Sequence, residues 1–365
     1  MLMQASTQWT TRPADERFTS LNELLDEVSH KREISTAKVL SNRAFHAAPV
    51  EDDPSRKQLV IVGPDDSPAQ PTHWSFGQVA ARVQAPAGYL RSLPSDIVAD
   101  ALNYGFYKRD VEEVGVLLRQ NGGPAELSAM TGPNYGRIWN EDVVSQLIDR
   151  FGDGVTGQFT VPGHYGMALD SVTKENTTIF GSDRDMFVFL ADEQNKIEVP
   201  NRRNGQSGFI SRGFFIWNSE VGAKTFGIAT FLFDYVCQNR IVWGPQEFQE
   251  FTIRHTSGAP DRFLEEAAPA IESYAEQSTT NILTAIQNAK DARLEPEKLD
   301  AFLAKRFSKN QATAIKLAHK IEEERPIESL WDVTVGATAY ARKIEHQDAR
   351  VDIERKAGQI MELAS

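Results

Sequence analysis

The sequence predicts an α+β protein with a curved antiparallel sheet core, flanking helices and an all-helical C-terminal unit. Short apolar or alternating segments follow one another through the middle of the chain. Helical periodicity replaces them from about residue 260, and Gly, Pro and Asp clusters separate the segments. Since 365 residues exceed what one core usually holds, we expect three parts, residues 1–70, 71–256 and 257–365.

The first part carries one predicted helix and two predicted strands. Residues 20–28 begin with Ser20 and repeat apolar side chains at helical spacing, and Glu23 fits a capping box. Residues 38–45 and 57–62 are predicted strands, separated by an acidic turn and followed by a loop rich in Pro and Asp.

Two predicted helices follow, at residues 75–83 and 94–104. Their spacing resembles a helix-turn-helix, but the first turn of the second helix offers almost no side chain that could read bases. A packed helical pair is therefore the favoured interpretation.

The centre of the chain predicts the sheet. Residues 140–151 form a helix that begins at Asn140 with acidic residues in its first turn. Around that helix, alternating or apolar runs predict strands, at residues 117–119, 126–130, 157–161, 177–180, 186–190, 208–217 and 227–236.

The C-terminal part predicts helices only, at residues 261–289, 295–306, 309–324, 327–342 and 348–363. Their apolar stripes and acidic outer faces suit side-by-side helix packing. We expect these helices to support self-association or partner docking, so that the protein is a homo-oligomer.

Net charge, cysteine count and hydrophobic segments limit the classes of function that we expect. The net charge of −12 counts against coating duplex DNA by bulk electrostatics, but it leaves room for a local basic groove. A single cysteine, Cys237, excludes an internal disulfide and fits a reducing cytoplasm. Neither a signal peptide nor a transmembrane segment is predicted, so we expect a cytoplasmic protein without a membrane partner.

Familiar catalytic motifs are missing from the sequence: there is no phosphate loop, zinc helix, CxxC pair or nucleophile elbow. We therefore predict no catalytic residue, metal ligand or cofactor, and enzymatic activity is not favoured. His164 and His255 lie in loops, where a structural hydrogen bond is the commoner role. A metal-dependent nuclease stays an alternative because carboxylates lie among the central strands, at Asp170, Glu175, Asp183, Asp185, Asp192 and Glu193.

Residues 201–255 reverse the acidic balance of the chain, with eleven aromatic residues and six Arg or Lys against four acidic residues. Ring faces and basic side chains together are what single-strand binding requires. The phosphate candidates are Arg137, Arg202, Arg203, Arg212, Lys224, Arg240 and Arg254, and the stacking candidates are Tyr135 and Trp217. Arg202 and Arg203 lie in a polar, loop-like stretch where truncation should hardly affect stability. Core packing is the competing interpretation for each aromatic residue, and solvated surface for each basic one.

Several segments together resemble a phage and plasmid family known only as domain of unknown function 932. They are HWSFGQVAARVQAPAGYLRSLPSDIVADALN, LLRQNGGPAELSAMTGPNYGRIWNEDVV, FFIWNSEVGAKTFGIATFLFDYVCQNRIVWG, FTIRHTSG and LWDVTVGATAYARKIEHQDARVDIERKAGQIM. The resemblance covers about residues 70–362. Its most specific parts are Asn218-Ser219-Glu220-Val221-Gly222 and Val236-Cys237-Gln238-Asn239. The stretch before Tyr135 departs from the pattern, so Ser128 need not match the family's serine.

Membership of that family implies a mobile-element context, the cytoplasm of a bacterial host and neighbouring replication and recombination genes, but no chemistry. The motif residues Asn218, Glu220, Gly222, Cys237 and Asn239 are interpreted as structural, because amides and carboxylates often satisfy backbone groups at turns. The favoured function is binding of single-stranded DNA without bond-breaking catalysis, an activity that annealing also requires. The alternatives are a counter-defence or regulatory protein that binds a host protein, and a metal-dependent nuclease.

Overall fold

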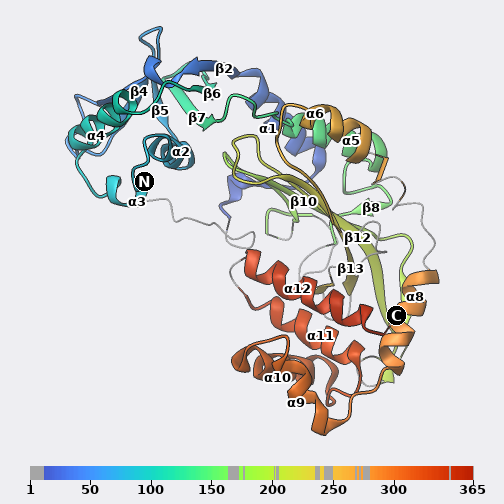
Figure 1. The fold of residues 1–365 in the computed structure, drawn as a ribbon. Helices are drawn as coiled ribbons and strands as arrows, with labels where there is room; N and C mark the ends of the chain where they lie inside the picture. Colours follow the sequence, from blue (N-terminus) through green and yellow to red (C-terminus); the bar gives the residue numbers. More distant parts are fainter. Residues whose placement is uncertain are drawn as a thin grey trace.

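The computed structural model confirms the α+β class: two open sheets are followed by a helical C-terminal region (Figure 1). The structure describes residues 12–162, 172–175, 177–200, 202, 205–234, 239–241, 250–267, 269–270, 273, 280–344 and 347–364, with only the backbone at 239–241, 250 and 347–348. None of the described helices is long and apolar enough to cross a membrane.

The central sheet is antiparallel and has the order β1-β9-β10-β12-β13-β14. Its long strands are β10 (Met186–Asp192), β12 (Gly208–Asn218) and β13 (Phe226–Asp234), close to the predicted bounds. Short strands complete it: β1 (Arg17–Phe18), β8 (Phe159–Thr160), β9 (Ile179–Gly181), β11 (Ile197–Val199), β14 (Asn239–Ile241) and β15 (Glu250–Ile253).

Helices α1 (Leu21–Glu33), α5 (Asn140–Phe151) and α6 (Ala259–Arg262) share a core with one face of this sheet. The α5 bounds match the predicted helix. At the start of α1, Ser20 accepts the Glu23 N–H at 3.1 Å, whereas the Glu23 carboxylate accepts from Thr19 N at 2.6 Å, one residue before the expected capping-box partner.

The other face of the central sheet is aromatic. Because side chains alternate along a strand, every second residue of β10, β12 and β13 falls on this face. The buried cluster there includes Val351 of α12 and seven rings, those of Phe180, Phe187, Phe189, Phe215, Trp217, Phe231 and Phe233.

The second sheet has the order β2-β6-β7-β5-β4-β3, with one parallel pair, β5 and β7. Its strands are β2 (Ser35–Ser41), β3 (His46–Pro49), β4 (Leu59–Val62), β5 (Pro68–Pro71), β6 (Glu113–Arg119) and β7 (Ala125–Thr131). The expected division at residue 70 falls inside β5, one of the strands of this sheet.

The predicted helical pair covers the second sheet. Helices α2 (His73–Arg82) and α4 (Ser95–Lys108) bury their apolar faces against it, and the short α3 (Ala87–Leu90) lies between them in the chain. The two helices therefore pack together on this core, as the favoured interpretation of a packed helical pair expects.

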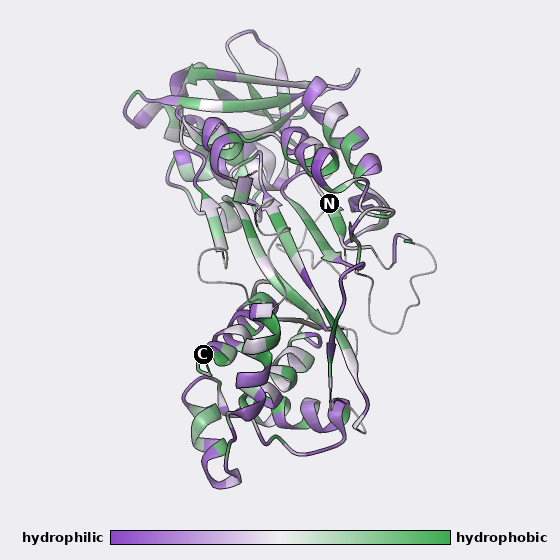
Figure 2. Cartoon of the chain, turned by 90° about the vertical axis from the view of Figure 1, so that its right-hand side faces the viewer, coloured by the Kyte–Doolittle hydropathy of each residue, from purple (hydrophilic) through white to green (hydrophobic). Residues whose placement is uncertain are grey.

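The C-terminal helices form a third part. They are α8 (Thr280–Asp291), α9 (Pro296–Ala304), α10 (Lys309–Glu323), α11 (Leu330–Ala341) and α12 (Gln347–Glu362). Their core includes Ile197, Ile210 and Leu232 of the central sheet, and hydrophilic residues mark much of their outer surface (Figure 2). Before these helices, α6 and a π-helical turn at Phe263–Ala267 pack into the core of the central sheet.

Candidate nucleic-acid interface

The turn between β12 and β13, residues 219–225, lies where the two sheets meet. Two side chains from the segment after β7 bind its backbone. The Tyr135 hydroxyl donates to the Ser219 carbonyl at 2.7 Å, and Arg137 Nε donates to the Glu220 carbonyl at 2.8 Å. The turn is therefore held by the segment that follows β7, which is the last strand of the second sheet in the sequence.

Val221 anchors the same turn to the second sheet. Its carbonyl accepts hydrogen bonds from Trp74 Nε1 at 3.0 Å and Gln78 Nε2 at 2.7 Å, both on α2. Its side chain is buried in a small cluster with Leu117 and Ala129. Polar and apolar contacts thus join the two sheets at one residue.

Buried polar side chains complete the junction. Glu220 Oε2 accepts from Arg119 Nη2 at 2.6 Å, and its Oε1 accepts from the backbone N–H of Asn140 at 2.8 Å. Asn218 Nδ2 donates to the Ile138 carbonyl and to Asn140 Oδ1, both at 2.8 Å. Two residues of the Asn-Ser-Glu-Val-Gly segment, Asn218 and Glu220, therefore bind the start of α5.

Gly222 closes the turn with a φ of +81°, a conformation that favours glycine. A Cβ at this position would lie 3.3 Å from Gln78 Nε2 and 3.4 Å from Thr131 Cγ2. Both the backbone conformation and the close neighbours therefore favour glycine here.

Guanidinium groups lie over aromatic rings along α2 and around this turn. From guanidinium carbon to ring centroid, Arg91 lies 5.1 Å from Phe76, Arg184 5.7 Å from Trp74, Arg32 5.2 Å from Trp139, and Arg137 5.5 Å from Tyr135 and 5.4 Å from Trp139. The His255 ring stacks on Tyr135, with centroids 4.8 Å apart. We call this set the arginine–aromatic chain: Phe76, Arg91, Trp74, Arg184, Tyr135, Arg137, Trp139, Arg32 and His255.

The arginines of this chain differ in how their charge is balanced. Arg32 pairs with Glu141 and Asp142, and Arg184 pairs with Asp185. In the part of the chain that the structure describes, Arg91 and Arg137 make no ion pair.

Burial lowers the pKa of both Arg91 and Arg137, because leaving water disfavours the charged form. The negative charge of Glu220 lies near Arg137, but its carboxylate already binds Arg119. Arg91 and Arg137 are thus partly desolvated cations without a carboxylate of their own among the residues that the structure describes.

The two titratable rings near Arg137, those of Tyr135 and His255, are neutral at pH 7. Burial raises the pKa of the Tyr135 phenol. Burial, together with the charge of Arg137, lowers the pKa of His255 despite its hydrogen bond to the Gly136 carbonyl. Positive charge in this cluster therefore comes from the guanidinium group.

Four of the predicted binding residues lie at or near this junction. Tyr135 and Arg137 belong to the arginine–aromatic chain, and Arg254 is exposed beside His255. Lys224 belongs to the turn itself, and its ammonium lies 5.5 Å from the centroid of the Phe187 ring.

Three other residues predicted to bind nucleic acid have buried side chains. Arg202 is 2% exposed and pairs with Asp234 and Glu323. Arg212 is buried and pairs with Asp192 at 3.2 Å. These arginines neutralise buried carboxylates, so their side chains do not face a groove.

Trp217 is the third correction. It is 8% exposed, and its ring centroid lies 5.2 Å from that of Phe215 in the aromatic face of the sheet. It is a core residue rather than a stacking platform. Arg203 and Cys237 lie outside the described residues, as do the side chains of Arg240 and Asn239.

Two of the carboxylates considered for a nuclease, Asp185 and Asp192, have other partners. Asp185 is buried and binds Arg12 and Arg184. Asp192 is buried and accepts from Gln158 and Arg212. Within the described ranges, no group of three His, Cys, Asp or Glu side chains could hold a metal ion, and Asp170 lies outside those ranges.

Sequence reasoning missed most of the arginine–aromatic chain. Trp74, Phe76 and Arg91 lie in a segment that was interpreted only as helical packing. An arginine that lies near an aromatic residue in the sequence is only a weak indication that the two side chains are in contact. The contact between Arg184 and Trp74 joins residues more than a hundred positions apart, so only the fold reveals it.

The fold and the junction define an α+β protein whose two sheets meet at an Asn-Ser-Glu-Val-Gly turn. The chain belongs to the family described as domain of unknown function 932 (DUF932), whose model matches residues 169–358 and includes that turn. Neither the curated proteins nor the solved structures contain a significant match to this chain.

Proposed function

We propose that this protein binds single-stranded DNA at the arginine–aromatic chain, without bond-breaking catalysis. The observation that carries the proposal is the state of Arg91 and Arg137. Each guanidinium lies over an aromatic ring, is partly desolvated and makes no ion pair in the described part of the chain.

Two physical arguments support this choice of ligand. Phosphate forms charge-assisted hydrogen bonds with a guanidinium, and these bonds are stronger where water is already partly removed. Aromatic faces next to a backbone-binding cation are typical of sequence-tolerant single-strand sites. A local excess of uncompensated cations also allows phosphate binding in a chain whose net charge is −12.

The proposed contacts revise the predicted set. Tyr135, Arg137, Lys224 and Arg254 are kept, Arg91 and Phe76 are added, and the buried Arg202, Arg212 and Trp217 are left out. Roles for Arg203 and Arg240 stay predictions, as does a cytoplasmic location.

A salt-titrated binding assay tests the phosphate contacts. Fluorescence anisotropy of a labelled oligo-dT strand is measured with wild-type protein and with the double variant Arg91→Ala, Arg254→Ala. For a single strand, log affinity falls with log salt by about 0.7 per phosphate contact. The double variant should weaken binding and flatten this slope by about 1.4.

Arg293→Ala is the matched control, since Arg293 is an exposed arginine of the C-terminal helical unit. It should leave affinity and slope unchanged. Phe76→Ala tests stacking and should cost about 1–3 kcal/mol of binding free energy. A wild-type protein that does not bind oligo-dT at about 50 mM salt would refute the proposal, and the host-protein alternative would then lead.

A further inference from the structure

Strand β2 lies at one end of the second sheet, and no strand of the described part of the chain pairs with its outer edge. It pairs with β6 on one side in an unbroken antiparallel register, Ser35↔Arg119 to Ser41↔Glu113. Its residues from Thr36 to Val39 are all exposed. An exposed edge of this length is a template for another strand.

The hydrogen bonds at the two ends of β2 show which backbone groups are free. Gln120 N donates to the Ile34 carbonyl at 3.1 Å, and Asn42 N donates to the Glu112 carbonyl at 2.9 Å. Antiparallel ladders alternate, so even-numbered residues of β2 bond to β6. The N–H and C=O groups of Ala37 and Val39 therefore point away from the sheet.

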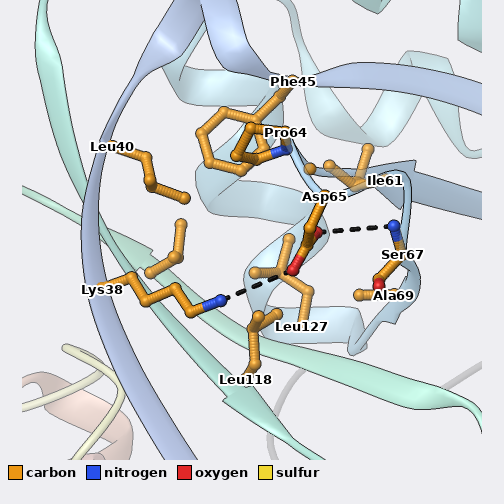
Figure 3. Close-up of a pocket in the computed structure, with 12 residues that line it drawn as sticks. Lys38, Leu40, Phe45, Ile61, Pro64, Asp65, Ser67, Ala69, Leu118 and Leu127 are labelled. Carbon is orange, nitrogen blue, oxygen red and sulfur yellow. Dashed lines mark hydrogen bonds and ion pairs between the residues drawn. The ribbon is translucent and has the colours of Figure 1, made fainter.

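A small, mainly apolar pocket lies beside this edge (Figure 3). It opens between β2 and the turn that joins β4 to β5, on the face of β2 that carries Lys38 and Leu40. Its wall is formed by apolar side chains of the second sheet, including Phe45, Ile61, Val116, Leu118 and Leu127.

One ion pair spans the pocket. Lys38 Nζ lies 3.5 Å from Asp65 Oδ2, and both side chains are about half exposed, at 43% and 55%. An exposed pair of this kind contributes little to stability and exchanges partners at low cost. Asp65 is thus a weakly held partner that an incoming acidic side chain can replace at Lys38.

We propose that β2 binds an extended segment of a partner protein as an additional strand, with an acidic side chain opposite Lys38 and aliphatic side chains two residues away. In strand addition, backbone hydrogen bonds provide affinity, and pockets for alternate side chains provide specificity. Here the N–H and C=O groups of Ala37 and Val39 supply the backbone hydrogen bonds, and the pocket and Lys38 supply the specificity.

In the register centred on Lys38, charge disfavours a second copy of this chain at the edge. Antiparallel pairing of β2 with itself about Lys38 would set two Lys38 side chains directly opposite each other, and like charges at that position are destabilising. An acidic side chain of a partner instead meets the opposite charge of Lys38, in exchange for its exposed pairing with Asp65. The inference does not depend on DNA binding, because the edge and the arginine–aromatic chain use different residues.

A labelled peptide, Thr-Val-Thr-Asp-Thr-Val-Thr, tests the proposal by fluorescence anisotropy. Its aspartate and two valines fall on one face of a strand. The full-length protein should bind this peptide, and Val39→Pro should weaken binding by about tenfold or more, because proline removes a free edge donor. Val39→Thr keeps the N–H and should bind like wild type.

Two further measurements make the test independent of that variant. A peptide with lysine in place of aspartate should bind wild-type protein more weakly, and Lys38→Thr should abolish the difference. Backbone amide exchange at Ala37 and Val39 should slow when the aspartate peptide is added. No binding by wild-type protein, or equal binding by Val39→Pro, refutes the proposal. An oligomer that Val39→Pro dissociates would assign the edge to a second copy and would also overturn it.

Discussion

Arg202 Nη2 lies 2.7 Å from Glu323 Oε1, and both residues are buried at 2% exposure. The same guanidinium pairs with Asp234 at the end of β13, also at 2.7 Å, and lies 5.6 Å from the centroid of the Trp331 ring. One arginine therefore ties the central sheet to α10 and α11. It couples the stability of the sheet to the docking of the C-terminal helices.

Replacing Arg202 by Ala should lower the free energy of unfolding by about 3–5 kcal/mol, because two buried carboxylates lose their cation. Urea denaturation measures the loss. Arg293→Ala removes an arginine that is 70% exposed and should change stability by no more than about 0.5 kcal/mol. Equal stability of the two variants would contradict a buried role and would restore the expectation of a tolerant loop.

Stability should fall in acid through Asp332. Burial by itself raises the pKa of this carboxyl, but the nearby His319 ring, 3.5 Å away, and hydrogen bonds from Arg325 and the Glu328 N–H more than offset it and hold the pKa below its usual range. The unfolded chain therefore takes up this proton first as pH falls. The stabilisation is complete well above the unfolded value of about 3.9 and is lost as pH falls below it.

Urea denaturation between pH 7 and pH 3 checks the expectation for Asp332. Asp332→Asn should flatten the acid limb of the stability curve. Asp300→Asn, at a side chain that is 78% exposed, should leave the limb as in wild type. An Asp332→Asn curve parallel to that of wild type would argue against the carboxylate network.

Two aromatic residues of β12 differ in burial, and their replacement should therefore differ in its effect on stability. Trp217→Ala should destabilise the protein by about 3–5 kcal/mol, because it leaves a cavity in the aromatic face. Phe209→Ala, at a side chain that is 46% exposed, should cost less than about 1 kcal/mol. Thermal unfolding ranks the two. If Trp217→Ala instead kept full stability and lost only DNA binding, the stacking interpretation of Trp217 would return.

Self-association is expected to involve α10. Leu317 and Ile321 lie one helical turn apart, and they are 57% and 53% exposed. Replacing both by Lys should reduce the mass measured by light scattering, because charges at an apolar contact oppose association. Leu283→Lys on α8 is the control at another exposed leucine. An unchanged mass in a folded double variant would exclude this face.

Local patterns in the sequence determined much of the secondary structure. The apolar run of β10, the alternation in β12 and β13, and the Asn140 start of α5 were all predicted within a few residues. These features depend on side-chain periodicity and on the chemistry of helix ends, which act between neighbours in the chain. The α+β class followed from them.

Only the tertiary structure decided which faces are covered and which distant segments meet. A period of two places Trp217 and Phe215 on one face, but it does not say whether that face is buried. A basic residue in a polar stretch, such as Arg202, has the same local signature whether it meets solvent or Glu323. The parallel pairing of β5 with β7 and the contact of Arg184 with Trp74 join residues far apart in sequence. Such contacts form because the assembled chain brings the segments together, and no window of neighbouring residues encodes them.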